Sequence, residues 1–148
     1  MNIYNNQNYF TNKQLLKILN RLGEAYKINK LYIIENKYDL IKHGVIMMNP
    51  MDWPEIIRGK IEGYYLPNSK TVIVYVFAHE EYDDFQSSQL YSIHALLHEL
   101  RHAYHKNQNI KGSEEDCDNF ATKYLNKNSK FFSKLMKWEH EWEVEEED

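Results

Sequence analysis

Hydrophobic side chains recur with helical spacing near the start of the chain. A helix is predicted from about Asn12 to Tyr26, with Thr11 in the capping position before it. Its apolar positions follow the i, i+3, i+4, i+7 pattern of one buried face, and they are Leu15, Ile18, Leu19, Leu22 and Tyr26. We expect this face to form part of the core.

The middle of the chain carries patterns typical of β-structure. Two short apolar runs, Leu31–Glu35 and Gly44–Met48, predict single strands. The segments Lys60–Leu66 and Thr71–Phe77 are rich in β-branched and aromatic residues, and the turn residues Pro67–Lys70 separate them. This arrangement predicts a β-hairpin, whose second strand has the strongest β signal in the sequence.

Three helices are predicted in the second half of the chain. The first runs from about Gln86 to Lys106, with an apolar stripe made of Leu90, Ile93, Leu97, Leu100 and Tyr104. The second begins at Ser113, after a short loop, and continues to about Leu125, burying Cys117, Phe120, Ala121 and Tyr124. The third, from about Lys130 to Trp142, presents Phe131, Leu135, Trp138 and Trp142. A helix, then strands, then consecutive helices is the order of an α+β fold.

The composition is that of one globular domain. The 148 residues are enough to bury a modest core, and 43% of them are hydrophobic and 27% charged. The single cysteine, Cys117, excludes an internal disulfide and a Cys-rich zinc module. No apolar run is long enough for a membrane span, and the polar, Asn-rich start lacks the pattern of a signal peptide. We therefore expect a cytoplasmic protein with no membrane partner.

The net charge of −4 is distributed unevenly. Residues 139–148 carry seven acids and no Lys or Arg, whereas the other 138 residues hold 18 bases and 15 acids. We therefore predict a single domain over residues 1–138 and a solvated acidic tail over residues 139–148. The alternative is that the tail folds over a basic patch or an active-site cleft. The nearly neutral body gives no support to nucleic-acid binding.

The long predicted helix contains His98-Glu99-Leu100-Arg101-His102, an H-E-x-x-H sequence. Its two His residues lie one turn apart on one helix face, so both imidazoles can bind the same metal ion. In such a site zinc lowers the pKa of its water to about 7, and Glu99 is placed to accept the proton. The alternative is an exposed, His-rich helix face without a metal.

A catalytic zinc site normally has three protein ligands and one open position. His94 and His105 lie on the same helix, but each is too far along the helix axis from one of the two H-E-x-x-H histidines to bind the same metal ion. The rise from His94 to His102 is about 12 Å, and that from His98 to His105 about 10.5 Å. We therefore expect these two to be surface or supporting histidines and the third ligand to come from another segment.

Glu114 is the best candidate for the third ligand, because it lies in the first turn of the next helix after a short loop. Asp118, four residues on, shares its face and can accept the free ring N–H of a metal-bound His. Glu115 and Asp116 are weaker ligand candidates, because they are rotated by about 100° and 200° from Glu114 around the helix. Alternatively, Glu114 and Asp116 only stabilise the helix N-terminus through the helix dipole.

His98–His102 followed by Glu114-Glu-Asp-Cys-Asp-Asn-Phe-Ala121 resembles the gluzincin signature, H-E-x-x-H and then E-x-x-x-D/N. It is similar in particular to the small ImmA/IrrE-type metallopeptidases, over about residues 60–126. The resemblance implies a zincin-like domain, in which a β-hairpin and a short mixed sheet pack on the active-site helix. It also implies His98, His102 and Glu114 as zinc ligands, Glu99 as general base and Asp118 as the orienting group.

The sequence departs from this family pattern at two positions. Arg101 stands where many zincins have a small residue, and Cys117 stands where Ala is usual. Neither position is a ligand in the family pattern. We interpret Cys117 as a small buried hydrophobic residue, with a thiol ligand as the alternative. The long insert of larger gluzincins is absent, so an enzyme of this kind would be a minimal version.

The function expected from these features is that of a zinc-dependent metalloendopeptidase acting on a peptide or protein substrate. The substrate is expected to lie antiparallel to Thr71–Phe77, an edge strand that would supply main-chain hydrogen bonds. Candidates for stabilising the oxyanion are Tyr104, His105, Arg101 and Tyr124. One alternative is a catalytically weak or inactive zinc-binding protein that acts as a regulatory or partner-binding module. The other is a metal-free interaction domain.

Overall fold

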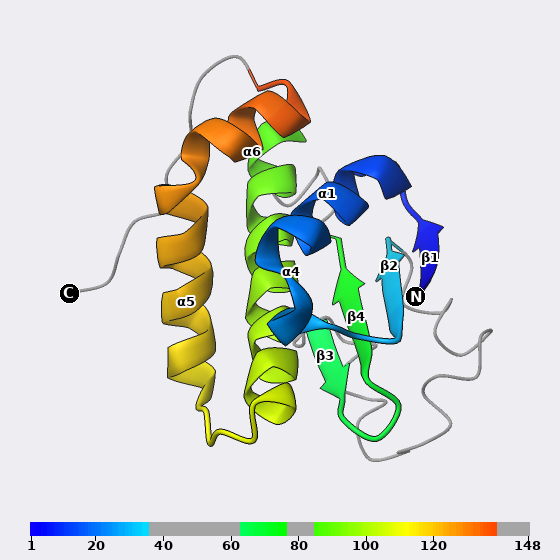
Figure 1. Ribbon diagram of the computed structural model, residues 1–148. Coiled ribbons are helices and arrows are strands. Elements are labelled where there is room, and N and C mark those ends of the chain that lie inside the picture. The colour runs from blue at the N-terminus through cyan, green and yellow to red at the C-terminus, as the bar shows by residue number, and fades with distance from the viewer. Residues whose placement is uncertain (36–62, 77–84, 139–148) are drawn as a thin grey trace.

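The computed structural model describes residues 1–35, 63–76 and 85–138, which form an α+β domain (Figure 1). The described strands are β1 (Asn2–Asn6), β2 (Lys30–Ile34), β3 (Gly63–Leu66) and β4 (Thr71–Tyr75). The described helices are α1 (Asn12–Leu22), α4 (Phe85–Asn107), α5 (Glu114–Lys127) and α6 (Ser129–Met136), with a 3-10 turn, η1 (Glu24–Tyr26). The predicted α+β class is confirmed for these residues. The predicted strand Gly44–Met48 and the acidic tail lie outside them.

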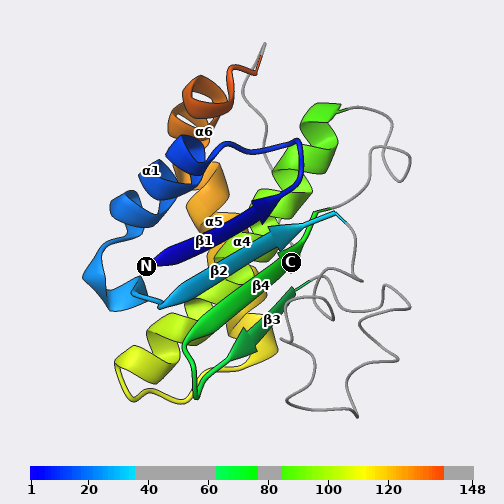
Figure 2. The same ribbon diagram turned by 90° about the vertical axis from the view of Figure 1, so that its right-hand side faces the viewer.

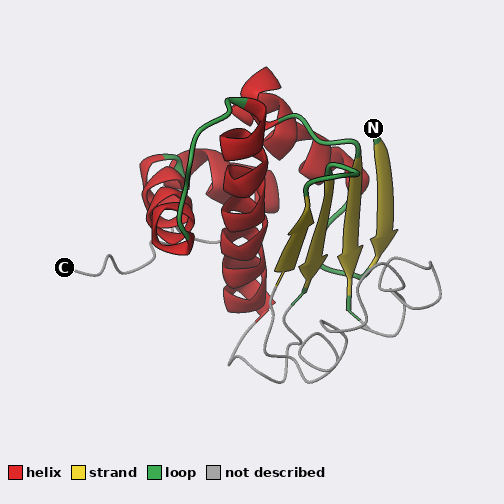
Figure 3. Ribbon diagram, turned by 90° about the horizontal axis from the view of Figure 1, so that it is seen from below, coloured by secondary structure: helices red, strands yellow, loops and turns green. Residues whose placement is uncertain are grey.

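The strands form one mixed sheet in the order β1-β2-β4-β3. The first three strands of this order are parallel to one another, and β3 is antiparallel to β4. Figures 2 and 3 show that the described helices all lie on one face of the sheet. Helix α4 packs directly against β3 and β4, and α5 packs against α4 on the side away from the sheet. The sheet, α4 and α5 therefore form three successive layers.

The prediction that Thr71–Phe77 is an edge strand for substrate is wrong. β4 is hydrogen-bonded to β2 on one side and to β3 on the other, so neither of its edges is open. The outer strands of the described sheet are β1 and β3. Of these two, β3 is the one that packs beside α4.

Strand β1 was not predicted, because three of its five residues are Asn, which is depleted in strands. It forms at the rim of the sheet, where its parallel pairing with β2 provides the main-chain hydrogen bonds. Tyr4 stacks on its register partner Tyr32 with ring centroids 4.5 Å apart. Main-chain pairing and one aromatic contact thus outweigh the low strand propensity of the Asn residues.

The core lies between the sheet and the helices. The predicted stripe of α4 supplies four of its buried residues, namely Leu90, Ile93, Leu97 and Leu100. They pack with inward-facing residues of the sheet, namely Leu31, Ile33, Val72 and Val74. Tyr104, the last member of the predicted stripe, is half-buried. No described helix has the length and apolar character required to cross a bilayer.

The predicted start of α1 is confirmed, but its predicted end is too late. Thr11 Oγ1 accepts a hydrogen bond from the Gln14 amide, which completes a capping box. The helix ends at Leu22 because Gly23 adopts φ +90°, a conformation that Gly tolerates better than other residues. The remainder of the predicted helix is the 3-10 turn η1.

Helix α6 is shorter than predicted and buries a different face. It ends at Met136, where Lys137 takes the left-handed conformation. Phe132 and Met136 are buried, whereas Phe131 is only half-buried. The guanidinium of Arg21 covers the Phe131 ring, with Cζ 4.3 Å from the ring centroid. Trp138 is buried as expected, and Leu135 is half-buried. Trp142 lies outside the described residues.

Candidate metal centre

The interface between α4 and α5 contains a row of paired polar side chains. Three His residues, each one turn further along α4, meet three α5 residues spaced by the same four positions in the opposite direction. The pairs are His94–Thr122, His98–Asp118 and His102–Glu114, with closest N···O distances of 2.9, 2.6 and 2.9 Å. This regular register follows from two antiparallel helices with equal rise per residue. It brings the H-E-x-x-H residues and the E-x-x-x-D residues together.

The carboxylate of Glu114 lies between the two imidazoles of the H-E-x-x-H sequence. Its Oε2 is 2.7 Å from His98 Nε2, and its Oε1 is 2.9 Å from His102 Nε2. The two His rings are 5.1 Å apart and inclined by 68° to one another. The structure therefore brings the three predicted ligands together, with both Nε2 atoms directed at the same group.

Asp118 holds the opposite side of the His98 ring. Its Oδ1 accepts a hydrogen bond of 2.6 Å from His98 Nδ1. This bond places a proton on Nδ1 and, in the neutral ring, leaves the lone pair of Nε2 available to a metal. The predicted orienting residue thus contacts the atom that its role requires.

Burial and nearby carboxylates have opposing effects on the histidines of this interface. Burial by itself lowers the pKa of His98, but the negative charges of Glu99, Asp118 and Glu114 raise it above its ordinary value overall. For His102, burial outweighs the attraction of Glu114, so the pKa is lowered. Burial also lowers the pKa of His94. The net effect on His98 shows that its surroundings favour a positive charge.

Glu99 lies at the junction of α4 and the outer strand β3. It is only 8% exposed, and its Oε1 is 3.9 Å from His98 Nε2. Gly63, the first residue of β3, lies so close that a Cβ there would be 2.8 Å from Glu99 Cγ. Strand β3 therefore approaches the predicted general base more closely than a strand with a side chain at this position could.

Cys117 is a second candidate for the third ligand position. Its side chain is fully buried, and its sulfur lies within 4.8 Å of ligand atoms of both His98 and His102. Burial, together with the nearby carboxylates of Glu114, Asp116 and Glu99, raises the pKa of the thiol to about 12. Imidazole nitrogen, carboxylate oxygen and cysteine sulfur are all donors that zinc accepts. The residues present therefore fit a zinc ion with either Glu114 or Cys117 as the third ligand.

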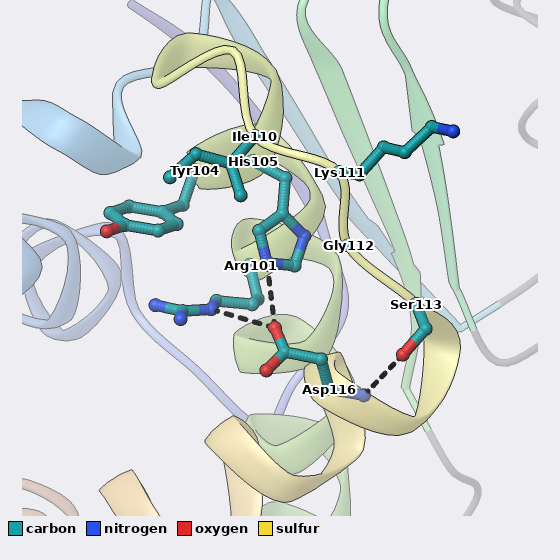
Figure 4. Close-up of a pocket in the computed structure, with 8 residues that line it drawn as sticks. All are labelled: Arg101, Tyr104, His105, Ile110, Lys111, Gly112, Ser113 and Asp116. Carbon is teal, nitrogen blue, oxygen red and sulfur yellow. Dashed lines mark hydrogen bonds and ion pairs between the residues drawn. The ribbon is translucent and has the colours of Figure 1, made fainter.

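His105 and Arg101 lie beside a cavity of about 600 Å³ where the α4–α5 loop joins α5 (Figure 4). Asp116 Oδ2 lies 2.7 Å from His105 Nε2, an ion-pair contact, and accepts a hydrogen bond of 3.4 Å from Arg101 Nε. Arg101 Nη1 also donates to the Tyr26 hydroxyl at 2.7 Å. Its guanidinium lies 4.2 Å from the centroid of the Tyr104 ring.

The remaining oxyanion candidates are also part of the packing between helices. Tyr104 stacks on Tyr26 with a centroid distance of 4.9 Å. Tyr124 packs against Phe120 and Phe132, and burial raises its pKa. Each of the four oxyanion candidates therefore contacts other side chains of the fold. Their role in stabilising an oxyanion stays a prediction.

The predictions did not include the contacts of His94, His105 and Asp116. His94 is half-buried and His105 is buried, and each contacts a residue of α5. A signal for His105 exists in the sequence: it follows His98 by seven positions, which places it on the same helix face. The role of Asp116 has no such local signal, because its partners belong to another helix.

A scan of protein-family models, a search of curated proteins and a search of solved structures each found no match to this chain.

Proposed function

We propose that this chain is a zinc-dependent metalloendopeptidase with a minimal zincin-like fold, in which His98, His102 and Glu114 bind the metal. The observation that carries the proposal is the position of one carboxylate against both Nε2 atoms, at 2.7 and 2.9 Å. Two aligned nitrogens and one oxygen from a separate helix are the ligand set of many catalytic zinc sites. The single cysteine is a free, buried thiol, which agrees with the reducing cytoplasm as the compartment.

Glu114 is preferred to Cys117 as the third ligand because of the position of its carboxylate. Its two oxygens lie 2.7 and 2.9 Å from the Nε2 atoms of the two rings, whereas the sulfur lies within 4.8 Å of ligand atoms of both rings. Asp118 is proposed to keep His98 in the tautomer whose Nε2 can bind a metal. When bound, zinc would polarise a substrate carbonyl and acidify a water molecule.

Glu99 is proposed as the general base. It is the neighbour of a ligand histidine in the chain, and its carboxylate lies on the same side of α4 as His98 Nε2, 3.9 Å away. A carboxylate at this position can accept a proton from the attacking water and transfer it to the leaving amine. Its low exposure protects this carboxylate from bulk solvent.

The substrate is proposed to pair with β3 rather than with β4. The outer edge of a sheet presents N–H and C=O groups that an extended peptide can bind, and among the described strands β3 is the outer one beside α4. Gly63 brings this strand close to Glu99. A peptide extending the sheet at β3 would therefore run along the side of the domain on which the general base lies.

The test is to incubate untagged protein with zinc and a mixture of peptides of diverse sequence, and to follow cleavage by mass spectrometry. Glu99→Gln keeps the size of the side chain but removes its basic oxygen. We expect the wild type to cleave peptides, and the variant to bind zinc equally well and to cleave none. Equal cleavage by the two proteins would contradict the role of Glu99. A zinc-loaded wild type that binds peptides but cleaves none would favour a partner-binding module.

A further inference from the structure

Apart from its contacts with His98 and His102, the Glu114 side chain is largely open to solvent, although the proposed site depends on it. Its side chain is 76% exposed, and it is the first residue of α5, directly after the loop from α4. Ser113 caps the helix through a 3.1 Å bond from the Asp116 amide to its hydroxyl. That bond fixes the local shape of the turn but not its position against α4. Another contact has to hold the first turn of α5 beside the two imidazoles.

Asp116 makes that contact from the same turn as Glu114. Its carboxylate forms an ion-pair contact of 2.7 Å with His105 Nε2 and accepts a hydrogen bond of 3.4 Å from Arg101 Nε, both residues of α4. His105 is buried, and Arg101 is itself fixed by the hydroxyl of Tyr26 in η1 and by the ring of Phe120 in α5. The first turn of α5 is thereby tied to groups with little freedom to move.

The loop before α5 fits closely around the same histidine (Figure 4). A Cβ on Gly112 would lie 1.9 Å from His105 Nδ1, so only a glycine allows the backbone to pass the ring at this distance. His105 therefore contacts the loop on one side and Asp116 on the other. This arrangement determines where the loop ends and where α5 begins.

The charge of Asp116 also requires a partner, because the first turn of α5 carries three consecutive acids, Glu114, Glu115 and Asp116. Acids at a helix N-terminus are favourable with respect to the dipole but repel one another. Arg101 places a permanent positive charge beside Asp116. This pairing leaves Glu114 as the acid of the turn that contacts His98 and His102.

We propose that Asp116 is a positioning residue, which His105 and Arg101 hold so that Glu114 reaches His98 and His102. This inference rests on the proposed function, since it concerns the ligand that Glu114 provides. The neighbouring Glu115 gives a matched control: it is exposed, lies in the same turn and carries the same charge.

The experiment compares the zinc affinity of Asp116→Asn with that of Glu115→Gln, by competition with a zinc chelator. We expect Asp116→Asn to lower the affinity by about 10–100-fold, as do other changes behind a metal ligand. Glu115→Gln removes the same charge from the same turn and should leave the affinity nearly unchanged. Equal losses in the two variants would overturn the proposal, because the effect would then be one of general charge.

A double-mutant cycle separates positioning from general destabilisation. In a Glu114→Ala background there is no ligand to position, so Asp116→Asn should cause little further loss of affinity. The same loss in both backgrounds would overturn the proposal. If Asp116→Asn does not fold without metal, His105→Gln and His105→Leu decide instead, since Gln retains a donor to Asp116 and should retain the affinity that Leu loses. A wild type that binds no zinc contradicts the proposed function itself, whereas additive losses contradict only the positioning.

Discussion

Replacing Gly63 by Ala tests how closely β3 approaches the proposed general base. The added Cβ would lie 2.8 Å from Glu99 Cγ, 3.2 Å from Glu99 Oε1 and 3.0 Å from the carbonyl oxygen of Ile73. The first distance is at least about 0.6 Å shorter than the 3.4 Å at which ordinary contact begins. The Ile73 carbonyl belongs to β4, which is hydrogen-bonded on both sides and has little freedom to move. The strain is therefore expected to displace Glu99.

The size of the effect follows from this contact. Overpacking of a filled site typically costs about 1–3 kcal/mol of stability. A displacement of the base by about 1 Å can reduce kcat on the order of 100-fold. Zinc affinity should change little, because neither atom of the clash belongs to a proposed ligand.

Denaturant unfolding of Gly63→Ala, Glu99→Ala and the double variant measures the strain without requiring a substrate. Glu99→Ala removes Cγ and the carboxylate, so Gly63→Ala should destabilise this background less than the wild type. We expect a coupling free energy of at least about 0.5 kcal/mol. If Gly63→Ala destabilises both backgrounds equally, Glu99 does not contact β3 as described.

Two further predictions concern zinc affinity, measured by chelator competition. We expect the loss of affinity to be largest for Glu114→Ala, about 10–100-fold for Asp118→Ala and smallest for Cys117→Ala. If Cys117→Ala loses more affinity than Glu114→Ala, the third ligand is the thiol. The affinity should also fall as the pH is lowered through the raised pKa of His98, because zinc binds only the deprotonated Nε2; an affinity that is constant between about pH 5 and 8 would contradict His98 as a ligand.

The sequence predicts the parts of the site that depend on local periodicity. His98 and His102 share a face because their spacing is one helical turn. The short α4–α5 loop keeps Glu114 close to them. Asp118 follows from the same reasoning on α5. The types of the other described helices and strands are predictable for the same reason, with errors at ends set by residues such as Gly23 and Lys137, whereas strand β1 was missed.

The features that were missed depend on contacts between distant segments. The interior position of β4 follows from pairing with β2, more than 30 residues earlier in the chain. The continuous apolar run of β4 is typical of a buried strand, but it does not identify β2 and β3 as the neighbours of β4. Likewise, the anchoring of Asp116 requires η1, α4 and α5 to be packed together before His105, Arg101 and Tyr26 surround it.

The most direct test of the central claim is anomalous diffraction at the zinc edge from crystals of the untagged protein grown with zinc. We predict one zinc ion per chain, bonded to His98 Nε2, His102 Nε2 and a carboxylate oxygen of Glu114 at about 2.0–2.2 Å. Crystals without an anomalous peak at these residues, or with Glu114 turned away from the peak, would contradict the account.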